Sequence, residues 1–443
     1  MTPPDLRLRR PSPGLIGLPW ERPLGDWDPD EVPLRELPVG PSRHLVRFVE
    51  VDGGLWALKE LPPRIARREF DVLRHLEETG LPAVRPAGLV TQPDHDCSIL
   101  LTRYLTGSWQ YRRLIARLPP NRPAHRSRLF DAMVGLIVEL HRHGVYWGDC
   151  SLANTLFSRD GQLFQAWLVD AETSEVHPSL SDGQRAQDLE ILVENVASGM
   201  VDLAASLGRP PEIEEQLIAE AMELPSRYEA LWEALHAQPQ FAFGDRYRIE
   251  GTVRELNDLG FVVDEVSLAP AEGGGGGDGG GGGAVRLRLL VGERNHHARY
   301  LEELTGLEVG EGQARILLGD LRAHQRAIAR EHPHRVGEEE AIASWMHDVL
   351  TPGMRRAHAA VRHVGTPVQA YCDLLEVRWL LSEQAGADVG TERALEALAE
   401  RAPTDSAARA LVADTASELP IVAPDPEVPP TPDPEVPPTP DRA

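Results

Sequence analysis

The chain has 443 residues, of which 42% are hydrophobic, and its formal net charge is −24 at pH 7. This apolar content is enough for two hydrophobic cores, so we expect a soluble globular protein with two domains and flanking tails. So negative a surface repels nucleic-acid phosphates on average, which excludes a general nucleic-acid binder. The three cysteines, Cys97, Cys150 and Cys372, form no CxxC pair, and no apolar run has the length of a membrane span. The composition predicts a cytoplasmic protein without disulfides or structural zinc that is not an integral membrane protein.

Residues 1–38 are rich in proline, tryptophan and acidic side chains, and we expect an irregular N-terminal extension that packs on the domain after it. Regular structure is predicted from near Ser42. There, residues 44–50 alternate as a strand, Asp52-Gly53-Gly54 favours a tight turn, and residues 55–59 return as the hairpin partner. The other elements predicted before residue 240 are a helix at 63–79, a strand at 99–105, a helix at 126–143, a hairpin formed by 155–157 and 167–169, and helices at 187–203 and 211–236.

A second region follows the predicted linker at residues 238–240 and begins near Gly244. Its predicted elements are a helix at 247–259, strands at 261–266 and 285–291, and several helices that continue to about residue 400. A glycine-rich run at 273–283 separates the two strands. Because this run precedes a strand instead of opening a helix, a flexible hairpin insertion is favoured over a dinucleotide-binding loop. Trp345 and Trp379 are expected to anchor the helical core of this region.

The C-terminal tail contains a repeated segment. Residues 424–431, PDPEVPPT, occur again as residues 432–439. Such a density of proline favours an extended chain and cannot build a core, so residues 403–443 are predicted to be disordered. A proline motif that binds a protein partner is the alternative for this tail.

Only one of the 45 basic side chains is a lysine, Lys59, at the end of the predicted hairpin. The helix predicted after it places Glu69 inside an apolar stripe. The stripe is formed by Ile65, Val72, Leu73 and Leu76. A buried carboxylate needs a cation, so Lys59 is the predicted partner, with its ammonium left to contact a ligand phosphate. The alternative is that Glu69 reaches water from the edge of the stripe, and that Glu77 or Glu78 pairs with the lysine.

Two further motifs carry polar side chains between predicted helices and strands. Asp149 precedes Asn154 by five residues in the loop WGDCSLANTLF, a spacing typical of a phosphotransfer loop. Asp170 ends the strand WLVD, and the predicted hairpin places it opposite Asn154. An amide oxygen and a carboxylate in this arrangement suit Mg²⁺, and Asp149 is then free to orient or deprotonate an attacking hydroxyl. Taken alone, Asp170 is also explained as a turn residue at the end of a strand.

The order of these features resembles a known superfamily. Hairpin lysine, helix glutamate, long helix, D-x-x-x-x-N loop and strand-ending aspartate follow one another, and residues 42–202 resemble the protein-kinase-like superfamily, nearest to bacterial lipopolysaccharide kinases. The segments WGDCSLANTLF, LVDAETSEVHPSLSDGQRAQDLE, LNDLGF, HHARYLEELTGL and RWLLSEQAG are more closely similar to the bacterial domain of unknown function 4032 family.

The resemblance implies an α+β fold and an ATP site. The fold would be bilobal, with a small antiparallel sheet and a helical lobe, followed by a smaller, mostly helical α/β domain. Lys59 then corresponds to the lysine on the α- and β-phosphates, and Glu69 to its partner on the helix. Asp149 corresponds to the catalytic base, and Asn154 and Asp170 to the Mg²⁺ ligands. Asp188 corresponds to a buried aspartate that braces the catalytic loop, with a helix N-cap as the alternative reading of that residue.

The sequence also departs from the pattern of this superfamily. No glycine-rich G-x-G-x-x-G loop lies between residues 38 and 55, so the cover of the phosphates is expected to use residues 40–44, with Arg43 as a contact. Asp170-Ala-Glu replaces Asp-Phe-Gly, which removes the aromatic switch. Only a short segment separates Asp170 from Asp188, which favours a small-molecule, sugar or lipid acceptor over a polypeptide.

These features predict an ATP- and Mg²⁺-dependent phosphotransferase. A pseudokinase that binds nucleotide without turnover is the alternative, and nucleotidyl transfer from ATP by the same site is a third reading. The predicted division is an extension at 1–38, a kinase-like domain at 39–240, a C-terminal domain at 244–402 and the tail. A protein partner is a further prediction for the C-terminal domain or the tail.

Overall fold

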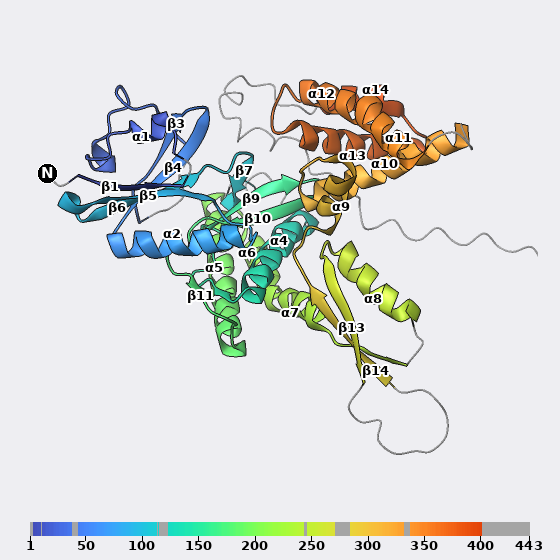
Figure 1. The fold of residues 1–443 in the computed structure, drawn as a ribbon, viewed down its shortest axis with the longest axis horizontal. Coiled ribbons are helices and arrows are strands. Elements are labelled where there is room, and N and C mark those ends of the chain that lie inside the picture. The colour runs from blue at the N-terminus through green and yellow to red at the C-terminus, as the bar shows by residue number, and fades with distance from the viewer. Residues whose placement is uncertain are drawn as a thin grey trace, which may run out of the picture.

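The computed structural model describes residues 3–9, 11–37, 43–112, 114, 123–242, 246–270, 284–331 and 337–400. These residues form an N-terminal antiparallel sheet, a helical region and a mostly helical C-terminal part, as the α+β prediction required (Figure 1). The glycine-rich run at 273–283, the tail at 403–443 and residues 38–42 lie outside the described residues. In the described part of the chain, no helix combines the length and the apolar character needed to cross a membrane.

The N-terminal sheet has six strands, each antiparallel to its neighbours. They are β1 (Asp5–Leu8), β2 (Leu34–Arg35), β3 (Val46–Val51), β4 (Gly54–Leu61), β5 (Pro86–Gln92) and β6 (Cys97–Arg103), in the order β1-β5-β6-β4-β3-β2. The predicted hairpin of β3 and β4 turns at Asp52 and Gly53, whose φ values of 51° and 70° suit a two-residue hairpin turn. Lys59 therefore lies on a central strand, opposite Val46 of β3 and Leu100 of β6.

The N-terminal extension is more regular than predicted. Its strand β1 pairs with β5, and α1 (Pro13–Ile16) and a short 3₁₀ turn at Leu24–Asp26 follow. Trp20 and Trp27 are buried and meet edge to face with ring centroids 5.3 Å apart. They share a hydrophobic cluster with residues of β3, β4 and β6, namely Val49, Leu58, Ile99 and Leu101. The extension thus covers the face of the sheet that points away from the helical region.

Helix α2 (Pro63–Glu78) follows β4 and crosses the other face of the sheet. Proline at its first position and Gly80, with φ of 70°, just beyond its end mark its limits, as predicted. Its buried side chains are Ala66, Glu69, Val72, Leu73 and Leu76. Because these residues include Glu69, the apolar stripe carries its carboxylate toward the interior of the protein.

The helical region contains the predicted long helix and hairpin. Its elements are β7 (Ser108–Gln110), α4 (Pro123–Arg142), β8 (Val145–Tyr146), β9 (Thr155–Asp160), β10 (Leu163–Leu168), β11 (Glu175–Val176), α5 (Asp182–Ser206), α6 (Pro211–Met222) and α7 (Leu224–His236). The single helix predicted for 211–236 is wrong, because the chain ends α6 at Met222 and starts α7 at Leu224. Pro225 explains the break, since it lacks an N–H donor and its ring crowds the preceding turn.

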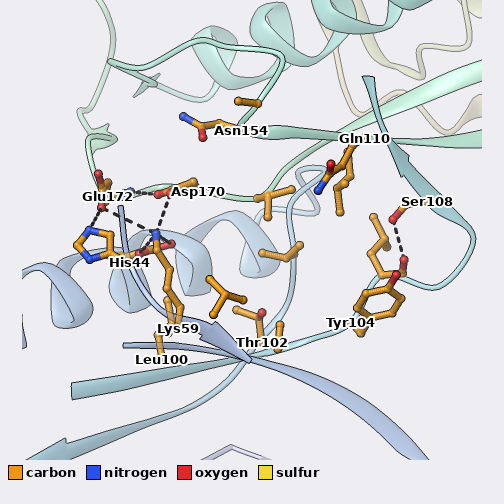
Figure 2. Close-up of a pocket in the computed structure, with 18 of the residues that line it drawn as sticks. His44, Lys59, Leu100, Thr102, Tyr104, Ser108, Gln110, Asn154, Asp170 and Glu172 are labelled. Carbon is orange, nitrogen blue, oxygen red and sulfur yellow. Dashed lines mark hydrogen bonds and ion pairs between the residues drawn. The ribbon is translucent and has the colours of Figure 1, made fainter. Parts of the chain in front are cut away.

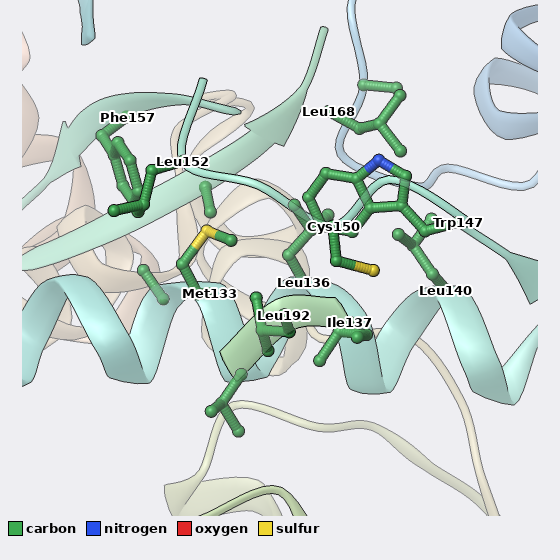
Figure 3. Close-up of a cluster of buried hydrophobic side chains, with 14 of the residues drawn as sticks. Met133, Leu136, Ile137, Leu140, Trp147, Cys150, Leu152, Phe157, Leu168 and Leu192 are labelled. Carbon is green, nitrogen blue, oxygen red and sulfur yellow. The ribbon is translucent and has the colours of Figure 1, made fainter. Parts of the chain in front are cut away.

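A dense core lies beneath the loop between β8 and β9 (Figure 3). Three side chains of this loop, Trp147, Cys150 and Leu152, are almost fully buried against α4 and α5. The facing side chains include Met133, Leu136, Ile137, Leu140 and Leu192. Apolar packing therefore fixes the loop from below, and it holds in place the polar residues that lie between the buried side chains of the loop.

The C-terminal part has two components. The first comprises β12 (Gln240–Ala242), α8 (Arg246–Asp258), β13 (Val263–Pro270) and β14 (Ala284–Val291), and the second comprises α9 (His296–Thr305), α10 (Glu311–Glu331), α11 (Glu338–Ser344), a π-helical turn (Trp345–Leu350), α12 (Thr351–Ala360), α13 (Pro367–Ala385) and α14 (Gly390–Glu400). Leu256 and Phe261 of the first component belong to the core of the helical region, whereas α9–α14 build a core of their own. Trp345 is fully buried in that core, but Trp379 is 48% exposed, so the anchoring prediction is wrong for Trp379.

Candidate active site

A cavity of about 580 Å³ opens between the N-terminal sheet and the helical region (Figure 2). Its apolar lining comes from β3, β4 and β6 on one side and from β9 on the other. These lining residues are Val46, Phe48, Ala57, Leu100 and Leu156. Thr102 and Tyr104 line the cavity where β6 leads into the helical region, and the Tyr104 N–H donates to the Leu55 carbonyl oxygen at 3.0 Å. A cavity with an apolar lining and charged groups at one end suits a ligand that has an apolar part and a charged part.

Lys59 and Glu69 meet at the polar end of this cavity. The Lys59 Nζ lies 3.3 Å and 3.1 Å from the two oxygens of Glu69 and donates to Asp170 Oδ2 at 2.8 Å. Only 1% of the Glu69 side chain and 15% of that of Lys59 are exposed. The structure therefore brings together three residues from β4, α2 and the end of β10, and the alternative partners Glu77 and Glu78 are not needed.

Burial and charge act on this cluster in opposite directions. Burial raises the pKa of Glu69 to about 7, although Lys59 lowers it. Burial would lower the pKa of Lys59, but the carboxylates of Glu69 and Asp170 together raise it above its ordinary value. The lysine thus stays charged at neutral pH and carries an ammonium group into the cavity.

Glu172 is a site residue that the sequence reasoning did not assign. Its carboxylate accepts from Arg43 at 2.9 Å and contacts His44 Nε2 at 3.1 Å, and it lies 3.8 Å from Lys59 Nζ. Arg43, the predicted phosphate contact, is 79% exposed and reaches across the cavity mouth to this carboxylate. Glu172 therefore links the segment before β3 to the segment after β10.

Asp149 and Asn154 lie in one loop at the cavity floor. The Asn154 Nδ2 donates to the backbone oxygen of Asp149 at 3.2 Å and to its Oδ2 at 3.0 Å. Asn195 of α5 donates to the other carboxylate oxygen at 3.3 Å and to the Cys150 carbonyl oxygen at 3.1 Å. The carboxylate of Asp149 is thus held by two amides while it still borders the cavity. Asn195 was not predicted.

The β9–β10 hairpin places Asn154 beside Asp170. Six residue pairs join the strands, from Leu163 with Asp160 at the closed end to Leu168 with Thr155 at the open end. Just beyond the open end, the Val169 N–H donates to the Asn154 carbonyl oxygen at 3.1 Å. Asn154 and Asp170 therefore both lie just beyond the open end of the β9–β10 ladder.

Asp188 lies directly beneath the loop that carries Asp149. Its two oxygens accept from the backbone N–H groups of Trp147 and Gly148 at 2.7 Å and 2.8 Å. Its Oδ2 also contacts His141 Nε2 at 3.1 Å, and His141 Nδ1 contacts the Tyr228 hydroxyl at 2.9 Å. Burial lowers the pKa of His141, although Asp188 raises it. Because Asp188 lies inside α5 (Asp182–Ser206), with Ser181 as the N-cap, the N-cap reading of Asp188 is excluded.

The oxygen atoms at the hairpin end suit a magnesium ion. Asn154 uses its amide nitrogen on Asp149, so its amide oxygen is available as a ligand beside the carboxylate of Asp170. Among the described residues, no group of three or more His, Cys, Asp or Glu side chains is arranged as a metal site. One carboxylate and one amide match Mg²⁺, which keeps phosphate and water oxygens in its shell and needs few protein ligands.

Fold and site together define a kinase-like domain, with a lysine on a sheet, a helix glutamate and an Asp/Asn/Asp set at one cavity. Residues 50–206 match the model of the Lipopolysaccharide kinase (Kdo/WaaP) family, and residues 230–402 match the model described as Domain of unknown function (DUF4032). The chain therefore combines a Kdo/WaaP kinase family domain with a DUF4032 domain.

Comparison with solved structures gives a match to WaaP in complex with acyl carrier protein, at 19% sequence identity and a TM-score of 0.30. The match covers 46% of this chain and 91% of that chain. Comparison with curated proteins gives no match.

Proposed function

We propose that this protein is an ATP- and Mg²⁺-dependent phosphotransferase that phosphorylates a hydroxyl group of a small-molecule, sugar or lipid-linked acceptor. The observation that carries the proposal is the convergence of Lys59, Asp149, Asn154 and Asp170 on one cavity, each held by a specific partner. If the ion pair between Lys59 and Glu69 served stability alone, there would be no reason for Asp149 and Asn154 to line the same cavity.

Each of these side chains has a role in the proposed reaction. The apolar slot holds the adenine ring, and the ammonium of Lys59 contacts the α- and β-phosphates while Glu69 fixes its position. Asn154 and Asp170 hold Mg²⁺, which neutralises phosphate charge when bound. Arg43 contacts the phosphates from the cavity mouth, and Asp188 supports the loop from below.

Asp149 orients the acceptor hydroxyl and receives its proton. The hydroxyl oxygen forms a bond to the γ-phosphorus, the bond from that phosphorus to the β,γ-bridging oxygen breaks, and ADP leaves with the electron pair. The two amides that hold Asp149 keep one geometry for this transfer.

A small acceptor is supported by the chain after Asp170. Between Asp170 and α5 the structure has only the two-residue strand β11, which pairs with β8. This segment is too short to build the platform on which a polypeptide substrate lies.

One observation favours the rival function, a pseudokinase that binds nucleotide without turnover. The carboxylate of Glu172 accepts from Arg43, contacts His44 and lies 3.8 Å from Lys59 Nζ, so it competes with phosphate for Arg43 and Lys59. Catalysis requires Glu172 to release these cations when ATP binds.

The first experiment uses the single lysine. An acyl-phosphate ATP probe forms a stable amide only with Lys59 or the N-terminal amine, and the adduct is mapped by mass spectrometry. Labelling of Lys59 that Mg-ATP suppresses supports the nucleotide site, whereas labelling of the N-terminus alone, or labelling insensitive to Mg-ATP, contradicts it. A search for acceptors then separates the readings: transfer of phosphate with release of ADP supports the kinase, transfer of AMP supports nucleotidyl transfer, and nucleotide binding without turnover supports the pseudokinase.

We also propose the domain division at 1–38, 39–240 and 244–402. It is supported by the separate core of α9–α14. Leu256 and Phe261 lie in the core of the helical region, so the α8–β14 part of the proposed C-terminal domain packs on the kinase-like domain.

A further inference from the structure

The closed end of the β9–β10 hairpin touches the C-terminal domain (Figure 1). The carboxylate of Asp160 accepts from the backbone N–H groups of Gly312 and Gln313 at 2.8 Å and 2.9 Å, at the start of α10. These N–H groups have no partner within the helix, so a carboxylate from the hairpin caps it.

The backbones approach too closely at this point for larger side chains. A Cβ atom on Gly312 would overlap the carbonyl oxygen of Asp160, and a Cβ on Gly161 would lie 2.7 Å from Ile316 and 2.8 Å from the Gly312 carbonyl oxygen. Gly161 also has φ of 62°, which a glycine adopts without strain. The fit between hairpin and α10 is therefore specific in shape.

Helix α13 holds the same turn from a second direction. The side chain of Gln369, 8% exposed, accepts from the Gly161 N–H at 3.0 Å and donates to the Gly161 carbonyl oxygen at 3.1 Å. Next to it, Arg159 pairs with Asp373 at 2.7 Å, with 10% and 7% of the two side chains exposed. Buried groups of this kind are costly to leave unpaired, so hairpin and α13 are bound to one relative position.

The hairpin connects this contact to the candidate active site. Its closed end carries Arg159, Asp160 and Gly161, and its open end carries Asn154 and Asp170. Six register pairs join the two strands between these ends, so the closed end and the open end belong to one hydrogen-bonded ladder. At the open end the strand is bonded to the sheet side through the N–H of Leu168, which donates to the Pro82 carbonyl oxygen at 2.9 Å.

We propose that the C-terminal domain positions the two candidate Mg²⁺ ligands by holding the closed end of the β9–β10 hairpin. Gly312, Gln369 and Asp373 are positioning residues, which act through the hairpin and touch neither nucleotide nor acceptor. This inference rests on the proposed function for its effect on Mg²⁺, and it gives the DUF4032 domain a role in the chemistry of the kinase-like domain.

The test compares two pairs of variants in the full chain. Gly312→Ala places a methyl group against Asp160, while Gly319→Ala, on the same helix, adds one where no atom lies within 4 Å. Gln369→Ala removes the contact to Gly161, while Gln384→Ala changes an exposed glutamine on the same α13. Amide hydrogen exchange of residues 155–168 and the Mg²⁺ concentration for half-maximal nucleotide binding are measured for each protein.

We expect Gly312→Ala and Gln369→Ala to speed amide exchange in the hairpin at least about tenfold and to raise the half-saturating Mg²⁺ concentration by a similar factor, about 1.4 kcal/mol. The two control variants should match the wild type in both measurements. A merely structural role would lower the melting temperature without shifting the Mg²⁺ dependence.

Unchanged exchange in both test variants overturns the proposal, and so does faster exchange with an unchanged Mg²⁺ dependence. If Gly312→Ala does not fold, the pair Gln369→Ala and Gln384→Ala decides between these outcomes. Wild-type protein that binds no Mg-nucleotide refutes the proposed function instead, and hydrogen exchange alone then shows whether the C-terminal domain holds the hairpin.

Discussion

Two polar clusters flank the loop that carries Asp149, one with several carboxylates around Lys59 and one built on Asp188 alone, and they differ in what surrounds them. Around Lys59, carboxylates from α2, from the end of β10 and from Glu172 share cations at the edge of a cavity. Below the loop, Asp188 is fully buried and bonded to two backbone N–H groups and a buried histidine. The carboxylates around Lys59 border the cavity, so a ligand that enters can replace their protein partners. Asp188 is fully buried and keeps its partners.

The difference teaches how one residue type serves two purposes. A carboxylate beside a cavity can trade a protein cation for a metal ion or a substrate proton, because water and ligand reach it. A carboxylate bonded to backbone N–H groups in a dry core is fixed, since moving it would leave those groups unpaired. Substitutions in the two clusters should therefore separate effects on chemistry from effects on stability.

The largest effect is expected for Asp149→Asn. The amide cannot receive the proton of the acceptor hydroxyl, so turnover should fall by about 10²–10⁴-fold. Nucleotide affinity should stay within about threefold, because the proposed role of Asp149 is toward the acceptor hydroxyl and not toward the nucleotide. Steady-state assays and calorimetric titration with Mg-ATP measure the two quantities, and unchanged turnover would remove Asp149 from the mechanism.

Asp188→Ala should act on stability. It leaves the buried N–H of Trp147 and the part-buried N–H of Gly148 without an acceptor, at about 1–3 kcal/mol for the buried group, so the melting temperature should fall by several degrees. Asp182→Ala, at an exposed position on the same α5, is the matched control and should change it little. Equal melting temperatures for both variants would show that Asp188 does not brace the loop.

Asp170→Asn should act on metal-dependent binding. Loss of the carboxylate weakens Mg²⁺ binding, so the affinity for Mg-ATP should fall at least about tenfold, or about 1.4 kcal/mol. Affinity for ATP measured in EDTA should change much less. Nucleotide binding that is equal with and without Mg²⁺ in both proteins counts against the ligand role.

The smallest effect is the pH dependence contributed by Glu69. Its pKa is about 7 in the folded protein, above the ordinary value of 4.5, because it is buried. The folded state therefore binds a proton that the unfolded state releases, and the contribution of Glu69 to wild-type stability rises as pH falls from 7 toward 4.5.

Glu69→Gln lacks this contribution. The difference in melting temperature, wild type minus Glu69→Gln, should thus be larger at pH 5.5 than at pH 8. Each kcal/mol of unfolding free energy that the protonated Glu69 contributes corresponds to about 2–4 °C. Glu78→Gln, at an exposed position near the end of α2, should follow the wild type at both pH values. A constant difference between wild type and Glu69→Gln would contradict the assigned protonation.

Periodicity made the local elements predictable. The β3–β4 hairpin, α2, α4 and the β9–β10 hairpin all follow from apolar spacing and from turn residues. Strand β5 was missed, because the run from Pro86 begins with proline, alanine and glycine and does not alternate. Strand β1 was missed because its partner lies about 80 residues further along the chain, and no local pattern reports that pairing.

The site was predictable where a side chain contradicted its surroundings. Glu69 stood out as a charge within an apolar stripe, and Asp149 and Asn154 by their spacing. Asn195 follows Asp188 by two helical turns and so shares its face of α5, a signal that could have found it. Glu172 and His141 had no such signal, because their partners come from elements more than 40 residues away.

Asp160 caps a helix through the N–H of Gly312, which lies 152 residues later in the chain. During synthesis the hairpin leaves the ribosome long before α10 and α13 exist, so its turn remains hydrated until those helices form. Under the proposal that the C-terminal domain positions the hairpin, the kinase-like half reaches its final geometry only when the last third of the chain has folded onto it. A prematurely terminated chain would carry every residue of the candidate site and still lack the contacts that hold its hairpin.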